Sequence, residues 1–269
     1  MKLYFTSSDI HSFYSEWMDA LHNKGFDLTN HDHCVIICGD LLDRGLESNK
    51  CYEFVKTLAE QGRLVYVRGN HEDLLFEAVR CIDKRKHLGR HHLSNGTLQT
   101  IVDMMGTNIY DLLGYTFDWK KWDELINDTL LPFISTNCVD YFELGDTIFV
   151  HGWVPTAEVS DTDRTLAVHD NWREGNWTEA RWENGMQMFN FGLAPKSKNI
   201  VCGHWHASYG HANITKSCTE FGPDAIFTPF VFYNEETDST IMAIDACTAH
   251  TRFVNCVVFD EEGGLIENV

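Results

Sequence analysis

Short apolar runs alternate with helix-like stretches in the first part of the chain. The runs are rich in valine and isoleucine, which is typical of strands that are covered on both faces. Helix-like stretches at 12–24, 47–61 and 72–86 separate the early runs. The expected strands are 2–6, 34–38, 64–67, 147–150, 199–202, 229–233, 240–244 and 253–259. The early alternation of strand and helix predicts βαβ units in the N-terminal half.

The later strands follow one another with little helix between them, which predicts a second sheet packed on the first. Residues 84–135 differ from both parts, because they begin with the basic stretch KRKHLGRHH and continue with two helix-like segments. We expect a helical insertion there. The sequence thus predicts an α/β fold of two packed mixed sheets flanked by helices, formed by a single domain over residues 1–269.

Polar clusters follow five of the expected strands, at the point where each strand ends. The clusters are Asp9 with His11, GDLLDRG at 39–45, GNHE at 69–72, His151 with Gly152, and GHWH at 203–206. In open α/β sheets, ligands bind at the carboxyl ends of the strands. We therefore expect these clusters to meet at one edge and form the functional site.

The residue types in these clusters indicate metal binding. Aspartate, asparagine and histidine supply oxygen and imidazole nitrogen, and no cluster contains a cysteine. This set suits a pair of manganese, iron or zinc ions better than a structural cysteine-zinc site. Two such ions about 3.5–4 Å apart polarise phosphoryl oxygens and lower the pKa of a shared water. The clusters therefore predict phosphoryl chemistry that uses a metal-activated hydroxide.

In this order, the five clusters resemble the motifs of the calcineurin-like metallophosphoesterase superfamily. The Arg-Gly ending of GDLLDRG and the glutamate of GNHE resemble its serine/threonine protein phosphatase branch. Bacterial and phage members of that branch and the symmetrical diadenosine tetraphosphatases share these motifs. The resemblance spans residues 9 to 206 and implies the αββα sandwich of that superfamily.

The resemblance also implies a role for each motif residue. Asp9 and His11 would bind a first divalent metal ion, and Asp40 would bridge it to a second. The other implied ligand of the first ion is His206. Those of the second ion are Asn70, His151 and His204. Manganese is the favoured metal, with iron or zinc as alternatives.

Catalytic roles follow from the same resemblance. His71 would be the general acid that protonates the leaving group, oriented by Asp43, and Arg44 would bind the phosphate with its planar fork of donors. A further phosphate-binding arginine is expected between His151 and His204, with Arg173 favoured over Arg181. The sequence departs from the family pattern at Ser12 and Trp153, which we expect to reshape the rim of the pocket.

Composition narrows the possible partners and location. The formal net charge is −19 and no basic stripe offsets it, which argues against nucleic acid. No run approaches the roughly 18–20 apolar residues of a membrane span. The first residues do not resemble a signal peptide, and the nine cysteines form no CxxC pair, so we expect reduced thiols and a cytoplasmic protein.

Three functions remain open at this stage. The leading one is hydrolysis of phosphate monoesters, as by a serine/threonine protein phosphatase. The alternative is hydrolysis of a small phosphate compound, such as a symmetrical diadenosine tetraphosphate, in a pocket narrowed by the insertion. A binding protein without turnover is disfavoured, because His71, Asp43 and Arg44 are not needed to hold metals. Each residue also has an ordinary explanation, such as Asp9 as a helix N-cap, but five such coincidences in order are improbable.

Overall fold

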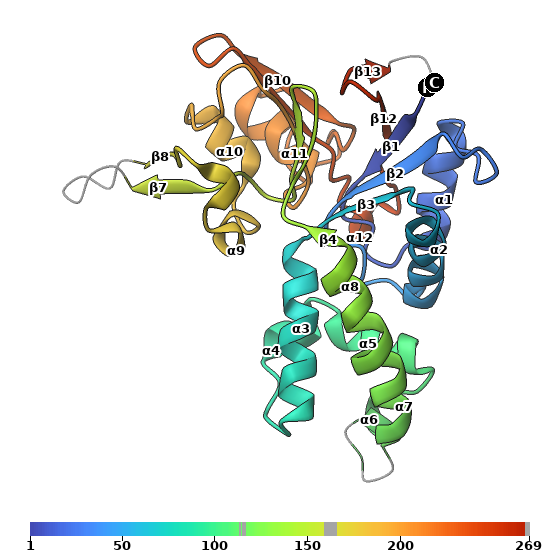
Figure 1. Cartoon of the computed structure of the whole chain (residues 1–269). Helices are drawn as coiled ribbons and strands as arrows, with labels where there is room; N and C mark the ends of the chain where they lie inside the picture. Colours follow the sequence, from blue (N-terminus) through green and yellow to red (C-terminus); the bar gives the residue numbers. More distant parts are fainter. Residues whose placement is uncertain (113, 115–116, 159–165, 267–269) are drawn as a thin grey trace.

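Two mixed β-sheets packed face to face form the centre of the computed structural model, which describes residues 1–112, 114, 117–158 and 166–266 (Figure 1). The strands of the first sheet, in spatial order, are β13 (Leu265–Ile266), β12 (Val257–Asp260), β1 (Leu3–Ser7), β2 (His33–Cys38), β3 (Leu64–Val67) and β4 (Cys138–Val139). Those of the second are β10 (Phe230–Asn234), β11 (Ser239–Ala243), β9 (Asn199–Cys202), β6 (Thr147–Phe149) and β5 (Phe142–Leu144). The predicted α/β class with two mixed sheets is confirmed.

Parallel pairing places the polar clusters at one edge of each sheet. In the first sheet, β1, β2 and β3 run parallel to one another, while β12 runs antiparallel to β1. In the second, β9 runs parallel to both β6 and β11. The segments that follow β1, β2 and β3 therefore leave the first sheet on the same side, as the βαβ pattern predicts.

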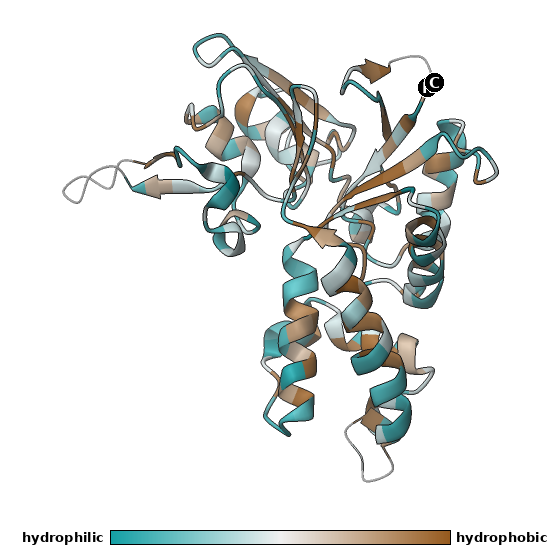
Figure 2. Cartoon of the chain, viewed as in Figure 1, coloured by the Kyte–Doolittle hydropathy of each residue, from teal (hydrophilic) through white to brown (hydrophobic). Residues whose placement is uncertain are grey.

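The central strands β2 and β9 are mainly apolar along their length (Figure 2), and consecutive residues in them are buried, which explains why these runs show no alternation. Between the sheets, Ile36 and Val67 of the first pack with Phe149, Val201 and Met242 of the second. The outer faces of the central strands pack on helices, so these strands are covered on both faces. Helices α1 (Tyr14–Asn23) and α2 (Ser48–Glu60) cover the first sheet.

Helix α3 (Asn70–Asp83) starts two residues earlier than the expected segment 72–86. Gly69 is its N-cap, and the side chain of Glu72 accepts a hydrogen bond from the Gly69 amide at 2.7 Å. Through this bond, Glu72 caps the helix at Gly69, and the residues after Gly69 in the GNHE motif form the first turn of the helix. The motif therefore lies at a helix N-terminus that directly follows a strand.

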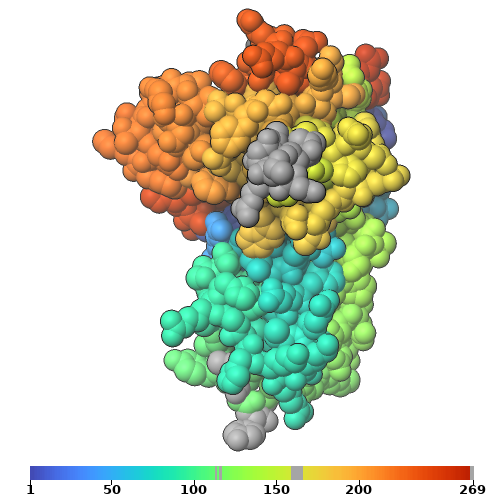
Figure 3. Space-filling model, turned by 90° about the vertical axis from the view of Figure 1, so that its left-hand side faces the viewer, coloured from blue at the N-terminus to red at the C-terminus, as the bar shows by residue number. Residues whose placement is uncertain are grey.

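The described residues between α3 and β4 form a helical lobe that extends away from the sheets (Figures 1 and 3). Its elements are α4 (Arg90–Ser94), α5 (Thr97–Met105), α6 (Ile109–Leu112), α7 (Trp119–Trp122), a π-helix (Asp123–Leu130) and α8 (Leu131–Asn137). The helical character expected for residues 84–135 is thus present. Trp122, Ile126 and Leu130 are buried in the same apolar core as α2, so the lobe shares its core with the first sheet.

Short elements complete the second half of the chain. They are β7 (Thr156–Glu158), β8 (Leu166–Val168), a 3-10 helix (Trp172–Glu174), α9 (Trp177–Ala180), α10 (Gly185–Asn190), α11 (Ala207–Tyr209), a π-helix (Gly210–Ile214) and α12 (Thr248–Thr251). The strand expected at 253–259 begins only at Val257. Arg252, just before the expected strand, has a φ of 56°, and Phe253 is half exposed. The chain therefore turns before it can join the sheet.

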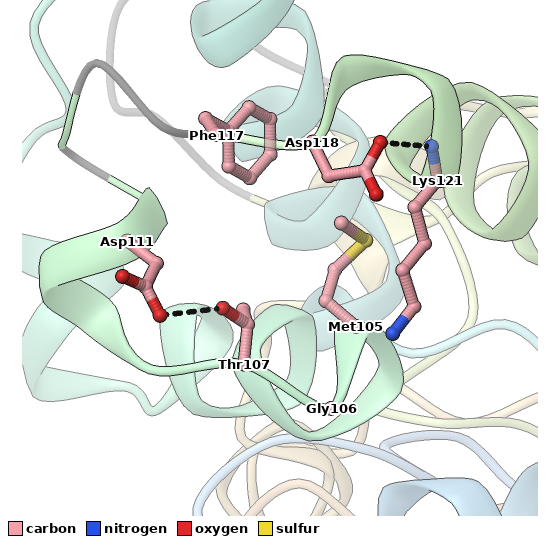
Figure 4. Close-up of a pocket in the computed structure, with 7 residues that line it drawn as sticks. All are labelled: Met105, Gly106, Thr107, Asp111, Phe117, Asp118 and Lys121. Carbon is pink, nitrogen blue, oxygen red and sulfur yellow. Dashed lines mark hydrogen bonds between the residues drawn. The ribbon is translucent and has the colours of Figure 1, made fainter.

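A hollow of about 340 Å³ opens in the lobe, between α5 and α7 (Figure 4). Two local hydrogen bonds line it, since Thr107 donates one to Asp111 at 3.2 Å and Asp118 accepts one from the Lys121 amide at 3.0 Å. None of the predicted site residues lines it. The hollow follows from the packing of the lobe, and the candidate site lies elsewhere.

Candidate active site

Six of the predicted metal ligands meet where the strands of both sheets end. We call these six the ligand group: Asp9, His11, Asp40, Asn70, His151 and His204. On one side, the Nε2 atom of His11 lies 3.9 Å from Oδ1 of Asp9 and 3.9 Å from Oδ2 of Asp40. On the other, Nε2 of His151 lies 3.3 Å from Oδ1 of Asp40 and 2.8 Å from Oδ1 of Asn70. Asp40 thus faces both sides, one oxygen to each.

The structure contains two sets of potential ligand atoms within 4.8 Å of one another at this place, and Asp40 belongs to both. His11 and His71 accompany Asp40 in one set, and His151 and His204 accompany it in the other. A carboxylate shared by two adjacent sets is the arrangement that a bridging ligand requires.

A backbone carbonyl holds each histidine of the ligand group by the ring nitrogen that points away from the group. The pairs are His11 Nδ1 with Leu42 O at 3.0 Å, His151 Nδ1 with Cys38 O at 2.8 Å, and His204 Nε2 with Trp182 O at 3.2 Å. A carbonyl only accepts, so each of these nitrogens donates, and the lone pair is left on the other nitrogen. Metal-binding histidines in proteins are usually fixed in this way.

Electrostatics at this place also favour cations. Asp9, Asp40 and Asp245 are all buried within a small region. Burial, followed by repulsion from Asp9, raises the pKa of Asp245 well above its usual value, and burial likewise raises that of Asp40. Burial lowers the pKa of His11, and it lowers that of His204 to about 3, so both rings are neutral. Buried carboxylates beside neutral imidazoles fit divalent cations, which would offset the unfavourable burial of negative charge.

The loops that carry the site have a constrained backbone. Seven residues with positive φ, between 51° and 76°, belong to them: Asp9, His11, Ser12, Asp40, Asp43, Arg44 and His204. Residues with a Cβ rarely adopt this conformation, and it concentrates at functional sites. The surrounding structure must hold these loops in place.

Glu72 is one of the residues that hold them. Its carboxylate accepts hydrogen bonds from the backbone amides of Asp40 and Leu41 at 3.1 Å each and from the Gly69 amide at 2.7 Å. It also accepts one from the Tyr66 hydroxyl at 2.7 Å. Glu72 therefore ties the loop after β2 to the loop after β3. The sequence contains this glutamate in GNHE, but nothing in its spacing identifies these partners.

His71, Asp43 and Arg44, which we call the acid group, lie beside the ligand group. His71 Nδ1 is 2.7 Å from Oδ2 of Asp43, and its Nε2 is 3.2 Å from Nη2 of Arg44 and 3.8 Å from Oδ2 of Asp40. Burial acts to lower the pKa of His71, but the Asp40 charge and the hydrogen bond to Asp43 outweigh it, so that the pKa is raised. These two partners thus shift the ring toward its protonated form.

Helix α5 of the lobe supports the acid group, which the sequence did not indicate. Thr100 donates a hydrogen bond to Oδ1 of Asp43 at 2.7 Å and accepts one from the Asp43 amide at 2.8 Å, while Thr97 donates to Oδ2 at 2.9 Å. Gly96 has a φ of +84°, and a Cβ there would lie 2.2 Å from the amide nitrogen of Arg44. The lobe therefore contacts the loop of the acid group directly.

Two predicted residues lie away from these two groups. His206 Nε2 is 3.2 Å from Oε1 of Glu220, and its ring packs on Phe221. The guanidinium of Arg173 binds both carboxylate oxygens of Glu143, at 2.8 and 3.0 Å. The structure does not bring His206 or Arg173 to the ligand group.

Arg181, the alternative to Arg173, is buried and pairs with Asp73 at 2.8 Å and with Asp140. These contacts place it near the first turn of α3, which contains Asp73. Of the two arginines, Arg181 is thus held next to the helix that carries Asn70 and His71. The sequence favours Arg173 only through its neighbouring residues. These cannot reveal that Arg173 pairs with the distant Glu143.

The two departures from the family pattern do not lie at the rim. Ser12 is fully buried, with its hydroxyl 2.9 Å from that of Ser48. Trp153 is also fully buried and donates a hydrogen bond to the Leu193 carbonyl at 2.7 Å. The expectation that they reshape the rim was therefore wrong, because both side chains point into the protein.

Comparison with known proteins places the chain in one family. The family model described as calcineurin-like phosphoesterase matches residues 5–228. Two curated relatives, both named asymmetrical bis(5'-nucleosyl)-tetraphosphatase PrpE, come from Bacillus velezensis and Bacillus subtilis. They are 32% and 33% identical over 79 residues, which are 27% of this chain and 32% of each relative. The match thus spans about a third of the length of these relatives.

Similar solved structures include a cold-active protein-tyrosine phosphatase of a Shewanella species, with a TM-score of 0.48 and 13% identity over 97% of this chain and 76% of that chain. Another is a metallophosphoesterase from Sphaerobacter thermophilus, with a TM-score of 0.45 and 14% identity over 99% of this chain and 89% of that chain. Among the described residues, no helix combines the length and apolar character that crossing a bilayer requires.

Proposed function

This chain belongs to the calcineurin-like phosphoesterase family, and from that membership we propose that it hydrolyses phosphate monoesters with two divalent metal ions, in the manner of a serine/threonine protein phosphatase. The observation that carries the proposal is the ligand group. Its shared Asp40 faces two sets of ligand atoms, and backbone carbonyls orient its three histidines.

The division of these residues between two ions follows the family resemblance. Asp9, His11 and Asp40 would hold the first ion. Asp40, Asn70, His151 and His204 would hold the second. When bound, the ions supply Lewis acidity toward the phosphoryl oxygens and lower the pKa of water. The nitrogen and oxygen ligands suit manganese, which we favour, and also iron or zinc.

The acid group would act on the two ends of the scissile bond. Because Nδ1 of His71 is engaged with Asp43, the other ring nitrogen, Nε2, would donate a proton to the leaving oxygen. The guanidinium of Arg44, 3.2 Å from that nitrogen, would bind phosphoryl oxygens. Asp43 would keep the ring oriented and favour its protonated form.

A second substrate class has specific support. Both curated relatives are named as tetraphosphatases acting on bis(5'-nucleosyl) compounds. The same ions and proton donor could cleave a phosphoanhydride, whose leaving group is already a good anion. The lobe next to the acid group would then limit the substrate to a small molecule. The predicted cytoplasmic location fits either substrate.

An assay of the purified chain against several substrates would test the proposal. Metal-stripped protein would be loaded with Mn²⁺ and assayed with a phosphoserine peptide, p-nitrophenyl phosphate, nucleotides and diadenosine tetraphosphate. Higher kcat/KM on the peptide than on the dinucleotide supports the proposal, and the reverse supports the second class. Hydrolysis that is unaffected by metal removal, or none on any substrate after loading, would contradict both.

A further inference from the structure

A second cluster of potential metal ligands lies outside the ligand group, in the helices beside it. It consists of Glu77 on α3 with His91 and His92 on α4. The Nε2 atoms of His91 and His92 lie 3.6 and 3.8 Å from Oε1 of Glu77, and the centroids of the two rings are 4.0 Å apart. Three potential ligand atoms from two helices thus converge on one place.

His92 distinguishes this cluster from an ordinary solvated pair of histidines. Its side chain has no exposed surface, and neither ring nitrogen has a hydrogen-bond partner among the described residues. Leaving a buried polar group unpaired costs about 1–3 kcal/mol. In the described part of the chain, both nitrogens of this buried ring therefore lack a partner.

The separations fit a bound cation better than hydrogen bonds. At 3.6 and 3.8 Å, the nitrogens are too far from Glu77 for N–H···O bonds, which span about 2.7–3.2 Å. Two ligands of a tetrahedral ion with bonds of about 2.0–2.2 Å lie roughly 3.4 Å apart. An anion does not fit, because the Glu77 carboxylate would repel it.

We propose that Glu77, His91 and His92 form an additional metal site that binds a zinc-class divalent ion. Two imidazoles and one carboxylate are a ligand set found for zinc in proteins, with water in the fourth position. The side chains of Glu77 and His91 are 54% and 47% exposed, which leaves a path from solvent and room for that water. The site is independent of the function proposed above.

A bound ion would fasten α4 to α3. Gly89, which precedes α4, leaves space for the ring of His91, because a Cβ at residue 89 would lie 2.3 Å from Cε1 of that ring. From α4 the chain continues through Asn95 and Gly96 into α5, whose threonines hold Asp43. The ion would therefore stabilise the part of the lobe that supports the acid group.

Zinc binding measured as a difference between variants tests the proposal. Metal-free protein would be equilibrated with Zn²⁺ alone, and bound zinc per chain would be determined by elemental analysis. His91→Ala and Glu77→Gln should each bind one zinc ion per chain fewer than the wild type, whatever the wild-type total is. The double variant should also bind one fewer, because both residues belong to the same site. His87→Ala, which removes an exposed histidine from the preceding loop, is the matched control and should bind as much as wild type. Unchanged zinc in both variants, or an equal loss in the control, would overturn the proposal.

A measurement on the unaltered chain avoids any effect of substitution on folding. Histidines would be modified with diethyl pyrocarbonate, with and without Zn²⁺, and located by mass spectrometry. Zinc should protect the exposed His91 at least about tenfold, since a coordinated nitrogen has no free lone pair. The exposed His31 serves as the internal reference. Equal modification of His91 with and without zinc would refute the site.

Discussion

The ligand group and the acid group are adjacent but are supported in different ways. The histidines of the ligand group are fixed by backbone carbonyls, for example His151 by that of Cys38 at the end of β2. Asp43 of the acid group is instead fixed by side chains from the lobe, Thr97 and Thr100. One region depends on carbonyls of the main chain, and the other depends on the packing of a helix against a loop.

This difference suggests that the two regions can change separately. Every residue has a main-chain carbonyl, so substitution of a side chain does not remove it. The orientation of the ligand histidines therefore follows from the fold. The support of Asp43 requires particular hydroxyls at residues 97 and 100. Substitutions in α5 should therefore alter proton donation without altering metal binding, and substitutions in the ligand group should abolish both.

The largest effect is expected from Asp40→Asn. The amide keeps one oxygen acceptor but loses the charge shared between both sets of ligand atoms. We expect the variant to lose bound metal, and kcat/KM to fall at least about 10³-fold, since metal ions contribute several kcal/mol. Elemental analysis and assays on p-nitrophenyl phosphate would measure both. Asp19→Asn, at an exposed position of α1, is the control. An active variant with its full metal content would refute the bridging role.

A smaller, selective effect is expected from Thr100→Val. Valine is nearly isosteric but removes both hydrogen bonds between Thr100 and Asp43. We expect kcat on a phosphoserine peptide to fall roughly tenfold, equivalent to ~1.4 kcal/mol, with unchanged metal content.

Thr107→Val is the matched control, because its hydroxyl binds Asp111 in the same lobe but not Asp43. It should leave kcat near the wild-type value. Loss of metal from Thr100→Val would show that the two regions are not separable.

The smallest effect is expected from His206→Asn. The resemblance implies that His206 reaches the first metal, but its Nε2 faces Glu220 at 3.2 Å in the structure. We expect bound metal to be unchanged and kcat to change by less than about tenfold. Loss of one metal ion per chain, measured by elemental analysis, would show that His206 is a metal ligand.

The meeting of the ligand group at one place could be predicted, because the signals for it are local in the sequence. Asp9, Asp40 and Asn70 each follow a continuous apolar strand, and the parallel order of such strands brings their ends together. Strands of two or three residues, such as β4 and β5, were missed, since they are too short to show a periodic pattern.

The support of the acid group could not be predicted for a different reason. Thr97 and Thr100 lie 54 and 57 residues from Asp43, and no motif joins them. Their role depends on how α5 packs against the loop after β2, which is a tertiary contact. Likewise, the residues next to Arg173 in the sequence are typical of a phosphate-binding arginine. Its ion pair with Glu143 is a tertiary contact that only the structure shows.

Replacing His71 by asparagine tests the separation of the two regions most directly. The variant should keep its bound metal, since His71 is not one of the proposed ligands. Proton donation to the leaving group typically contributes ~10²–10⁴ in rate, and p-nitrophenolate needs that proton less than an alkoxide. We therefore predict full metal content, with kcat falling much further on a phosphoserine peptide than on p-nitrophenyl phosphate. Equal losses on both substrates, or loss of metal, would contradict the assignment of His71 as the proton donor.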